Sequence, residues 1–141
     1  MEMILSAGII PVRNHQGREE FLLLRCFKYW DFPKGEIDPG EVPLQSALRE
    51  LIEETSISHV ELKWGESFYE TEVYSKGKTA RYYLGLVTGS PKVELLPNPE
   101  SGMVEHHEYR WVSFEEGINL CNPRIQKVFE WAKLKLKSEK S

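Results

Sequence analysis

Residues 35–57 constrain the fold and the chemistry of this chain more than any other part of the sequence. They read GEIDPGEVPLQSALRELIEETSI, a loop rich in glycine and proline followed by residues with helical apolar spacing. An α-helix turns by about 100° per residue, so Glu50, Glu53 and Glu54 fall on one face, while leucine and isoleucine side chains fall on the opposite face. The pattern predicts a helix over Pro43–Thr55 with an apolar side facing the core and an acidic side facing away from it.

This cluster of three glutamates needs a nearby positive charge. Like charges three or four residues apart oppose helix formation by roughly a few tenths of a kcal/mol per pair, and no lysine lies among them. Carboxylate oxygens are hard ligands that suit divalent ions such as magnesium and manganese. The glutamates taken alone are also compatible with a solvated acidic helix face that has no ligand.

Together with its loop, the segment closely resembles the Nudix box, a family signature with fixed spacing between a glycine, a glutamate, an Arg-Glu pair and a Glu-Glu pair. The matching positions are Gly35, Glu41, Arg49, Glu50, Leu51, Glu53, Glu54 and Ile57. Ser56 stands where the family has glycine, and serine in a left-handed conformation there would cost about 1 kcal/mol. The resemblance implies an α/β fold, specifically an α/β/α sandwich with a mixed β-sheet, and metal-dependent hydrolysis of a phosphoanhydride.

The resemblance also implies a metal site. Glu50, Glu53 and Glu54 would bind Mg2+, with Mn2+ as a possible substitute, and Glu105 would complete the site from a distant loop. Glu54 is our first candidate for the general base that deprotonates the attacking water, and Glu50 is the second. Family members differ in which carboxylate has this role.

Other residues of the box have supporting roles in the family. Arg49 would bond and orient the glutamates, and Glu41 would join it to brace the loop that begins at Gly35. Lys34, just before that glycine, is the expected phosphate contact, because its ammonium group can follow a polyphosphate without fixed geometry. An exposed loop lysine without a role is the alternative.

The flanking sequence looks like the asymmetric diadenosine tetraphosphate hydrolases of the animal and archaeal type. The similar stretches are residues 21–24, 30–35, 78–84 and 109–112. In that subfamily the residues corresponding to Lys78 and Tyr82 contact the phosphate chain, and an aromatic residue near Tyr74 stacks on adenine. Tyr82 also fits a core position, because strand alternation places it with apolar neighbours. Animal members carry a histidine where this chain has Lys28 and Tyr29; Lys28 can still meet a phosphate.

We therefore expect hydrolysis of a bis(5'-nucleosyl)-tetraphosphate to ATP and AMP. Bacterial relatives with the same Trp-to-Gly loop remove pyrophosphate from 5'-triphosphorylated RNA, and nothing in the acidic helix separates the two activities. A pyrophosphohydrolase acting on another nucleoside di- or triphosphate is a further alternative. A binding module without turnover is disfavoured, because such domains generally lose box glutamates and this chain keeps all four.

Length and composition fit one globular domain, residues 1–141, with 40% hydrophobic and 28% charged residues. The net charge of −4 gives no general attraction to nucleic acid. Cys26 and Cys121 are expected to be reduced, partly buried thiols. The apolar opening lacks a basic region and contains Pro11, so it reads as a strand rather than a signal peptide. We expect a cytoplasmic protein with a small-molecule substrate, no membrane association and no obligatory protein partner.

Periodicity and turn residues outline the remaining elements. Strands are expected at residues 3–12, 21–27, 60–64, 67–74, 79–87 and 109–112, with a loop over 30–40 and a hairpin turn over 75–78. Ser113 followed by Glu116 predicts the start of a short helix, and Asn122 the start of a final helix with a lysine-rich end.

Overall fold

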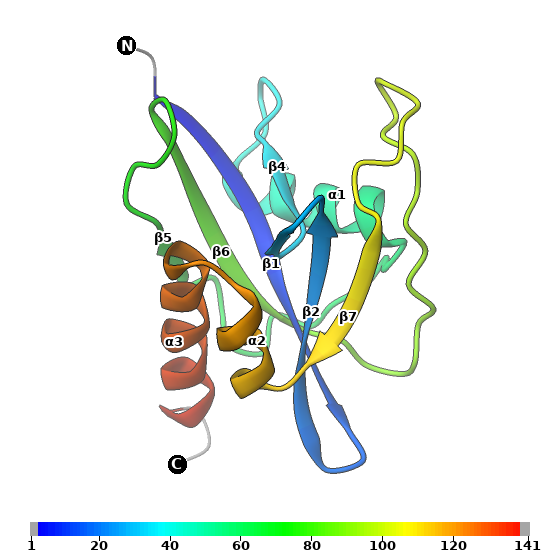
Figure 1. The fold of residues 1–141 in the computed structure, drawn as a ribbon, viewed down its shortest axis with the longest axis vertical. Coiled ribbons are helices and arrows are strands. Elements are labelled where there is room, and N and C mark those ends of the chain that lie inside the picture. Colours follow the sequence, from blue (N-terminus) through cyan, green and yellow to red (C-terminus); the bar gives the residue numbers. More distant parts are fainter. Residues whose placement is uncertain (1–2, 139–141) are drawn as a thin grey trace.

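The structure is a computed structural model that describes residues 3–138. Its centre is a seven-stranded sheet in which β3, β2, β1, β6 and β5 lie side by side in that order (Figure 1). The strands are β1 (Ile4–His15), β2 (Arg18–Cys26), β3 (Tyr29–Asp31), β4 (Lys34–Glu36), β5 (Phe68–Glu70), β6 (Lys78–Leu86) and β7 (Glu108–Val112). The helices are α1 (Pro43–Thr55), α2 (Phe114–Leu120) and α3 (Pro123–Ser138). Strand β4 pairs with β1 and β7 with β2; the β1–β6 pair is parallel and the others are antiparallel, so the sheet is mixed as predicted.

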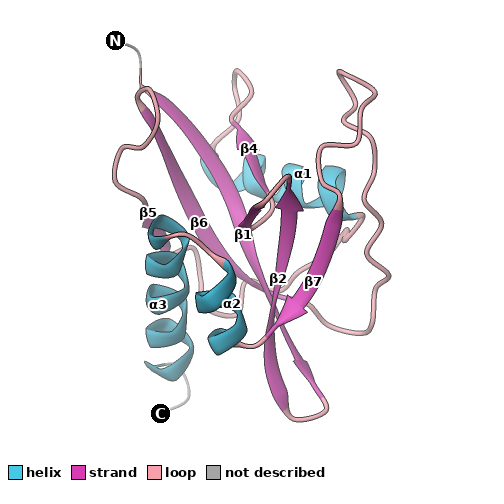
Figure 2. Cartoon of the chain, in the orientation of Figure 1, coloured by secondary structure: helices cyan, strands magenta, loops and turns pink. Residues whose placement is uncertain are grey.

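Helices cover both faces of this sheet (Figure 2). Ala47 and Leu51 of α1 belong to the buried cluster on one face. Phe129 and Ala132 of α3 belong to the cluster on the other face, where α2 also packs. The predicted α/β/α sandwich is confirmed.

The central strands are apolar on both faces because each face meets a helix layer. In β1, Ile9 packs in the cluster under α1 and Ile10 in the cluster under α3. In β2, Leu22 and Leu23 divide in the same way. Each of these side chains is 0% exposed, and burying one contributes about 1.5–3 kcal/mol. This two-sided burial accounts for the continuous apolar runs in the sequence.

Of the expected strands, the one over residues 60–64 is wrong and the one over residues 67–74 is too long. Residues 60–64 contribute only an isolated bridge, between Glu61 and Leu86, and then enter a turn at Gly65, whose φ is +79°. The strand expected over 67–74 is limited to β5, because continuous pairing with β6 ends at Glu70 and only an isolated bridge between Tyr74 and Lys78 follows. Both stretches lie at the edge of the sheet, where β propensity is not supported by a second neighbouring strand.

The loop expected over residues 30–40 is wrong in two places, because it contains the last two residues of β3 and the whole of β4. In β4, Lys34 pairs with Gly8 and Glu36 pairs with Ser6 of β1. Three residues are too few to produce an alternating pattern, so periodicity could not reveal this pairing. It fixes the loop backbone directly beside α1.

Both predicted helix starts after β7 are confirmed. The Ser113 hydroxyl accepts a hydrogen bond from the Glu116 amide at 3.1 Å, and the Glu116 carboxylate accepts one from the Ser113 amide at 3.1 Å. The Asn122 side chain caps α3 by accepting from the Ile125 amide at 3.1 Å. No helix within residues 3–138 is long and apolar enough to cross a membrane. Cys26 and Cys121 are free thiols, and burial raises the pKa of Cys121 to about 12.

Candidate active site

Arg49 is the central connection of the loop-helix segment. Its Nε and Nη2 donate to the two carboxylate oxygens of Glu41, at 2.8 and 3.0 Å. Its Nη1 donates to Glu50 and to Glu53, each at 3.0 Å, and Nη2 also donates to the Glu36 carbonyl at 3.2 Å. The planar guanidinium therefore ties the loop to the acidic face of α1, which is the bracing arrangement expected from the sequence.

The Glu41 carboxylate is strongly stabilised in its charged form. Hydrogen bonds from Arg49, followed by one from the Asp38 amide at 2.9 Å, lower the pKa of Glu41 to about 2. Arg49 donates hydrogen bonds to Glu41, Glu50 and Glu53, and these raise its pKa more than burial lowers it. The brace remains charged at any pH at which the protein would function.

Gly35 allows β4 and α1 to approach closely. A β-carbon at this position would overlap the carboxylate of Glu50. The φ of Gly35 does not lie in the left-handed region, so the backbone conformation does not require a glycine here. The space that the Glu50 carboxylate occupies is what requires it.

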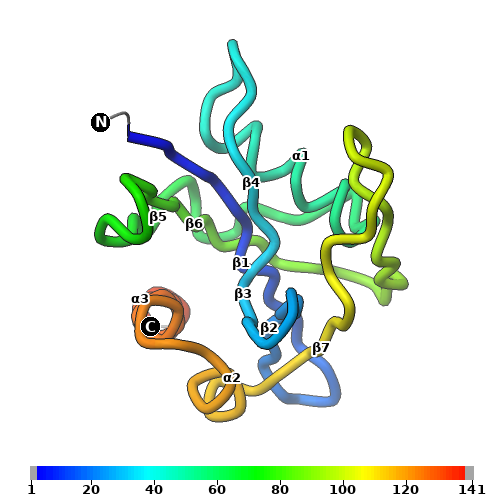
Figure 3. Tube along the Cα trace, turned by 45° about the horizontal axis from the view of Figure 1, so that its top comes forward, coloured from blue at the N-terminus to red at the C-terminus, as the bar shows by residue number. Residues whose placement is uncertain are grey.

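Glu54 occupies a different environment from the one predicted. We expected its side chain to face away from the core, but Glu54 is only 9% exposed. The loop over residues 97–107 covers it: Pro99, Glu105 and His106 line a small cavity with the three glutamates, and the tube trace places this loop beside α1 (Figure 3). The sequence could not reveal this cover, because the loop lies more than 40 residues further along the chain.

The buried carboxylate of Glu54 lacks a full set of partners. Its Oε1 is buried without a hydrogen bond, and His106 Nε2 lies 3.5 Å away. Burial, followed by the closeness of Glu50, raises the pKa of Glu54 well above its ordinary value. Burial and Glu50 therefore oppose the ionised form of Glu54, and a cation bound beside it would favour that form.

A divalent cation fits this donor set. Glu50, Glu53, Glu54 and Glu105 all line the small cavity, and the unpaired Oε1 of Glu54 is an available hard ligand. Within residues 3–138, no three acidic, histidine or cysteine side chains are already arranged as a metal cage. Arg49 already holds one oxygen of Glu50 and one of Glu53 by hydrogen bonds.

A larger cleft of 470 Å³ opens from the acidic helix. Arg49, Glu50 and Glu53 form one part of its lining, and Glu105 contributes from the covering loop. The remaining lining residues include three that we predicted from sequence to contact substrate: Lys34, Tyr74 and Lys78. Acidic and basic side chains from separate parts of the chain therefore share one cleft.

Lys34 is held in this cleft by opposite charges. Its Nζ lies 3.6 Å from Asp31 Oδ2, and its side chain is 23% exposed. Burial would lower the pKa of Lys34, but Asp31 and Tyr74 outweigh that effect and raise it. Lys34 therefore remains an ammonium group, suited to an anionic ligand.

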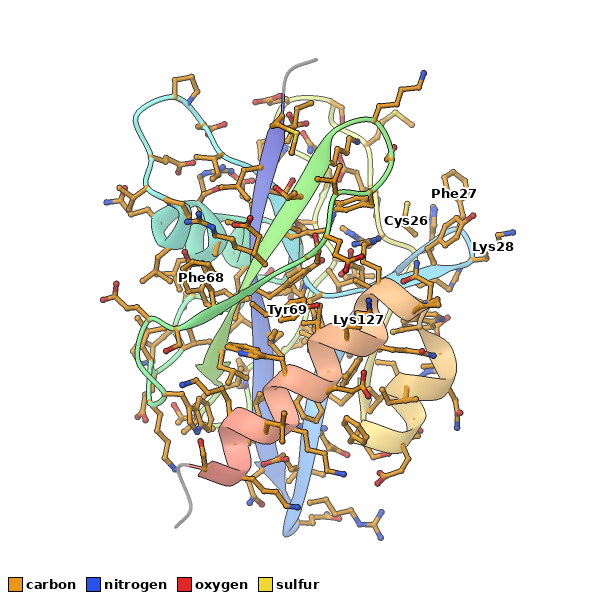
Figure 4. All side chains as sticks on the ribbon, turned by 90° about the vertical axis from the view of Figure 1, so that its left-hand side faces the viewer. Cys26, Phe27, Lys28, Phe68, Tyr69 and Lys127 are labelled. Atoms are coloured by element: carbon orange, nitrogen blue, oxygen red, sulfur yellow. The ribbon has the colours of Figure 1, made fainter. Side chains whose placement is uncertain are left out.

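Two residues predicted to contact substrate lie elsewhere. Tyr82 is 0% exposed in the core under α3, and its hydroxyl donates to Asp31 at 2.9 Å, so it does not reach the cleft. This geometry supports the alternative core placement. Lys28 lies in the turn between β2 and β3, points away from the body of the molecule (Figure 4) and does not line the cleft; its ammonium faces the Tyr29 ring at 5.5 Å.

Sequence reasoning missed three residues near the cleft. Asp31 contacts Lys34, Asn98 donates to Glu105 at 2.8 Å, and the Arg124 guanidinium covers the Tyr74 ring at 3.9 Å. Asp31 lies inside the Trp-to-Gly stretch that resembles the subfamily, which was a usable signal. Nothing in the local sequence marked Asn98 or Arg124.

A sequence profile of the NUDIX domain matches residues 3–132. The chain belongs to the Nudix family. It is 32% identical over 126 residues to the asymmetrical bis(5'-nucleosyl)-tetraphosphatase of Caenorhabditis elegans, covering 85% of this chain and 86% of that protein. It is 31% identical over 102 residues to an RNA pyrophosphohydrolase of Bartonella clarridgeiae, covering 63% and 59%.

The fold of this Nudix hydrolase also matches a solved structure. A C. elegans Ap4A hydrolase binary complex superposes with a TM-score of 0.78 at 27% sequence identity, over 96% of this chain and 99% of that one. The family is generally dependent on divalent metal ions, in agreement with the buried carboxylate oxygen of Glu54 that has no hydrogen bond.

Proposed function

We propose that this Nudix hydrolase cleaves a bis(5'-nucleosyl)-tetraphosphate asymmetrically, giving ATP and AMP from diadenosine tetraphosphate, with Mg2+ as the cofactor. The observation that carries the proposal is the shared 470 Å³ cleft, in which the acidic face of α1 meets Lys34, Lys78 and Tyr74. A polyphosphate needs cations along its length, and a nucleoside needs an aromatic surface. The similarity to asymmetrical tetraphosphatases supports this choice among nucleotide substrates.

Glu50, Glu53, Glu54 and Glu105 would hold the metal. When bound, the cation would neutralise phosphate charge and lower the pKa of the attacking water. Glu54 would accept the proton of that water, because its buried carboxylate has a raised pKa and is therefore a stronger base than an exposed glutamate. Glu50 is the second candidate for this role.

The bond changes are those of a simple hydrolysis. A bond forms between the water oxygen and a phosphorus atom, and the bond from that phosphorus to the bridging oxygen breaks. The electron pair leaves with the bridging oxygen on the departing nucleotide. Lys34 and Lys78 would hold the phosphate chain in line with the water, since positioning and charge neutralisation supply most of the catalysis in phosphoryl transfer.

Tyr74 would bind a nucleobase of the substrate. Stacking of a base on an aromatic ring contributes about 1–3 kcal/mol and tolerates any base. Arg124 occupies one face of the Tyr74 ring in this structure, so the other face is the one that would receive the base. This arrangement favours nucleotides without sharp base specificity.

The RNA activity remains the second candidate, because the chain is also similar to an RNA pyrophosphohydrolase and carries Lys133, Lys135 and Lys137 at the end of α3. Product analysis with Mg2+ separates the two candidates. We expect ATP and AMP in equal amounts from diadenosine tetraphosphate, with a kcat/KM much higher than that for 5'-triphosphorylated RNA. Preferred release of pyrophosphate or phosphate from RNA would contradict the proposal. Glu53→Gln should abolish turnover, whereas Glu130→Gln, on the exposed side of α3, is the matched control.

A further inference from the structure

A buried polar chain connects the core of the sheet with the cleft. It begins at Tyr82 of β6, which is 0% exposed and lies edge-on to Phe32, with ring centroids 5.8 Å apart. The Tyr82 hydroxyl donates to Asp31 Oδ1 at 2.9 Å. Burial, followed by the negative charge of Asp31, raises the pKa of Tyr82 well above its ordinary value, in agreement with a protonated hydroxyl that donates to Asp31.

Asp31 uses its two carboxylate oxygens differently. Oδ1 accepts from Tyr82 and, at 2.7 Å, from the amide of Phe32. Two donors on one oxygen fix the plane of the carboxylate. The other oxygen, Oδ2, faces the Lys34 ammonium at 3.6 Å.

The sheet itself brings these groups together. Gly8 of β1 pairs with Tyr82 of β6 on one side and with Lys34 of β4 on the other. A β-carbon at Gly8 would overlap the Pro33 carbonyl oxygen and the Lys34 β-carbon. The absent side chain allows the loop carrying Lys34 to lie against the strands, within reach of the tyrosine hydroxyl through Asp31.

We propose that Tyr82 and Asp31 form a positioning pair that aims the Lys34 ammonium at the phosphate chain of the substrate. The proposal rests on the phosphate-binding role of Lys34 in the proposed function. A lysine has a flexible stem with several rotatable bonds, so an unheld ammonium would lose conformational entropy on binding phosphate. Asp31, which Tyr82 holds in place, already restricts the Lys34 side chain in the free protein, so less conformational entropy is lost when phosphate binds. Tyr82 thereby acts on the substrate without touching it.

The titratable groups that face Lys34 come from several elements. Asp31, Tyr74 and Glu54 raise the pKa of Lys34, whereas burial and Arg124 lower it. Asp31 has the strongest attractive effect on Lys34, and its Oδ2 lies 3.6 Å from the Lys34 Nζ. The position of Lys34 is therefore most sensitive to Asp31.

The alternative is that Tyr82 and Asp31 only satisfy each other in the core. A double-mutant cycle separates the two possibilities, because a purely structural pair would act independently of Lys34. The probe is inorganic tripolyphosphate with Mg2+, whose dissociation constant is measured by calorimetry. The variants are Tyr82→Phe, Lys34→Gln and the double variant, with Tyr83→Phe as the control that removes a hydroxyl from the opposite face of the same strand.

We expect Tyr82→Phe to weaken tripolyphosphate binding about tenfold, in line with the loss of a hydrogen bond to a charged group. In the Lys34→Gln background the same change should have almost no effect, and Tyr83→Phe should leave binding unchanged. An equal loss in both backgrounds, or no loss in either, would overturn the proposal. If Tyr82→Phe does not fold, Asp31→Asn replaces it, because asparagine keeps the acceptor for Phe32 and removes the charge facing Lys34.

The cycle also separates this inference from the proposed function. Coupling between Tyr82 and Lys34 without hydrolysis of diadenosine tetraphosphate would leave the positioning pair intact and overturn the proposed substrate. Hydrolysis of diadenosine tetraphosphate, with tripolyphosphate binding that depends on Lys34 but shows no coupling between Lys34 and Tyr82, would support the proposed substrate and overturn the positioning pair. Tripolyphosphate binding that does not depend on Lys34 would overturn the positioning pair together with the phosphate role of Lys34.

Discussion

The carboxylate of Glu50 occupies the space that a side chain at residue 35 would need. An added β-carbon on Gly35 would overlap all three heavy atoms of that carboxylate group. Glu50 is also held by Arg49 at 3.0 Å, so it cannot move aside without losing that hydrogen bond. The glycine of β4 and the glutamate of α1 are therefore a matched pair.

Gly35→Ala should consequently reduce turnover without unfolding the protein. The new methyl group would push the Glu50 carboxylate out of the metal site, and misplacement by about 1 Å can cost roughly 100-fold in rate. Steady-state kinetics with Mg2+ would measure the loss, and thermal unfolding would serve as the control for folding. Near-normal kcat in the variant would contradict the close packing of residues 35 and 50.

Glu54→Gln should separate stability from activity. The buried carboxylate lacks a hydrogen bond at Oε1, and a neutral amide avoids the cost of burying a charge. We expect the variant to lose turnover by several orders of magnitude, to unfold at the same or a higher temperature than the wild type without metal, and to gain less stability from added Mg2+. Glu130→Gln is the matched control and should behave like the wild type in all three measurements. A variant that is stabilised by Mg2+ as strongly as the wild type would contradict the assignment of Glu54 as a ligand.

Local patterns in the sequence predicted the features that depend on neighbouring residues. Helix α1 begins at Pro43 and ends at Thr55 as expected, because its apolar spacing, its early proline and its acidic face are all visible within 13 residues. The contact between Arg49 and Glu41 is equally local, since the two residues are only 8 positions apart in the sequence. The same holds for the caps of α2 and α3.

Long-range packing decided what the sequence could not predict. Glu54 is buried because a loop from residues 97–107 lies over it. The hydrogen bond of the Tyr82 hydroxyl goes to Asp31, which is 51 positions away in the sequence. Strand β4 exists because β1 offers it a free edge over three residues, a pairing that leaves no periodic pattern. Such features follow from which segments meet in space, and no single window of the sequence contains that information.

Ser56→Gly should stabilise the protein. Ser56 adopts φ 69° and ψ 2°, the left-handed conformation expected for the glycine of the box, and its amide donates to the Ile52 carbonyl at 2.9 Å. Relief of this strain is worth about 1 kcal/mol, reduced by the loss of the Ser56 hydroxyl contact to the Glu94 carbonyl at 3.3 Å. Urea unfolding would measure the change. Ser56→Ala is the control: it keeps the strain and loses the hydroxyl, so it should not be more stable than the wild type.

Arg49→Met should release the Glu41 carboxylate from its brace. The folded-state pKa of Glu41 is about 2, below its ordinary value of 4.5, so the interaction stabilises the fold fully above pH 4.5 and is lost as the pH falls from 4.5 through 2. Without the guanidinium, the pKa of Glu41 should rise toward 4.5, and the corresponding part of the acid dependence of stability should disappear. Carbon-detected NMR titration of the Glu41 carboxyl would measure this shift.

Arg13→Met is the matched control for that experiment. Arg13 pairs with Glu20 at 2.7 Å in the hairpin of β1 and β2, so its loss removes a similar ion pair without touching the acidic helix. It should leave the pKa of Glu41 and the rate of hydrolysis unchanged. Arg49→Met should lower that rate, because Glu50 and Glu53 lose the donor that orients them. A pKa of Glu41 that stays near 2 in Arg49→Met would mean that the Asp38 amide alone holds the carboxylate, and that Arg49 organises the glutamates of α1 without bracing the loop.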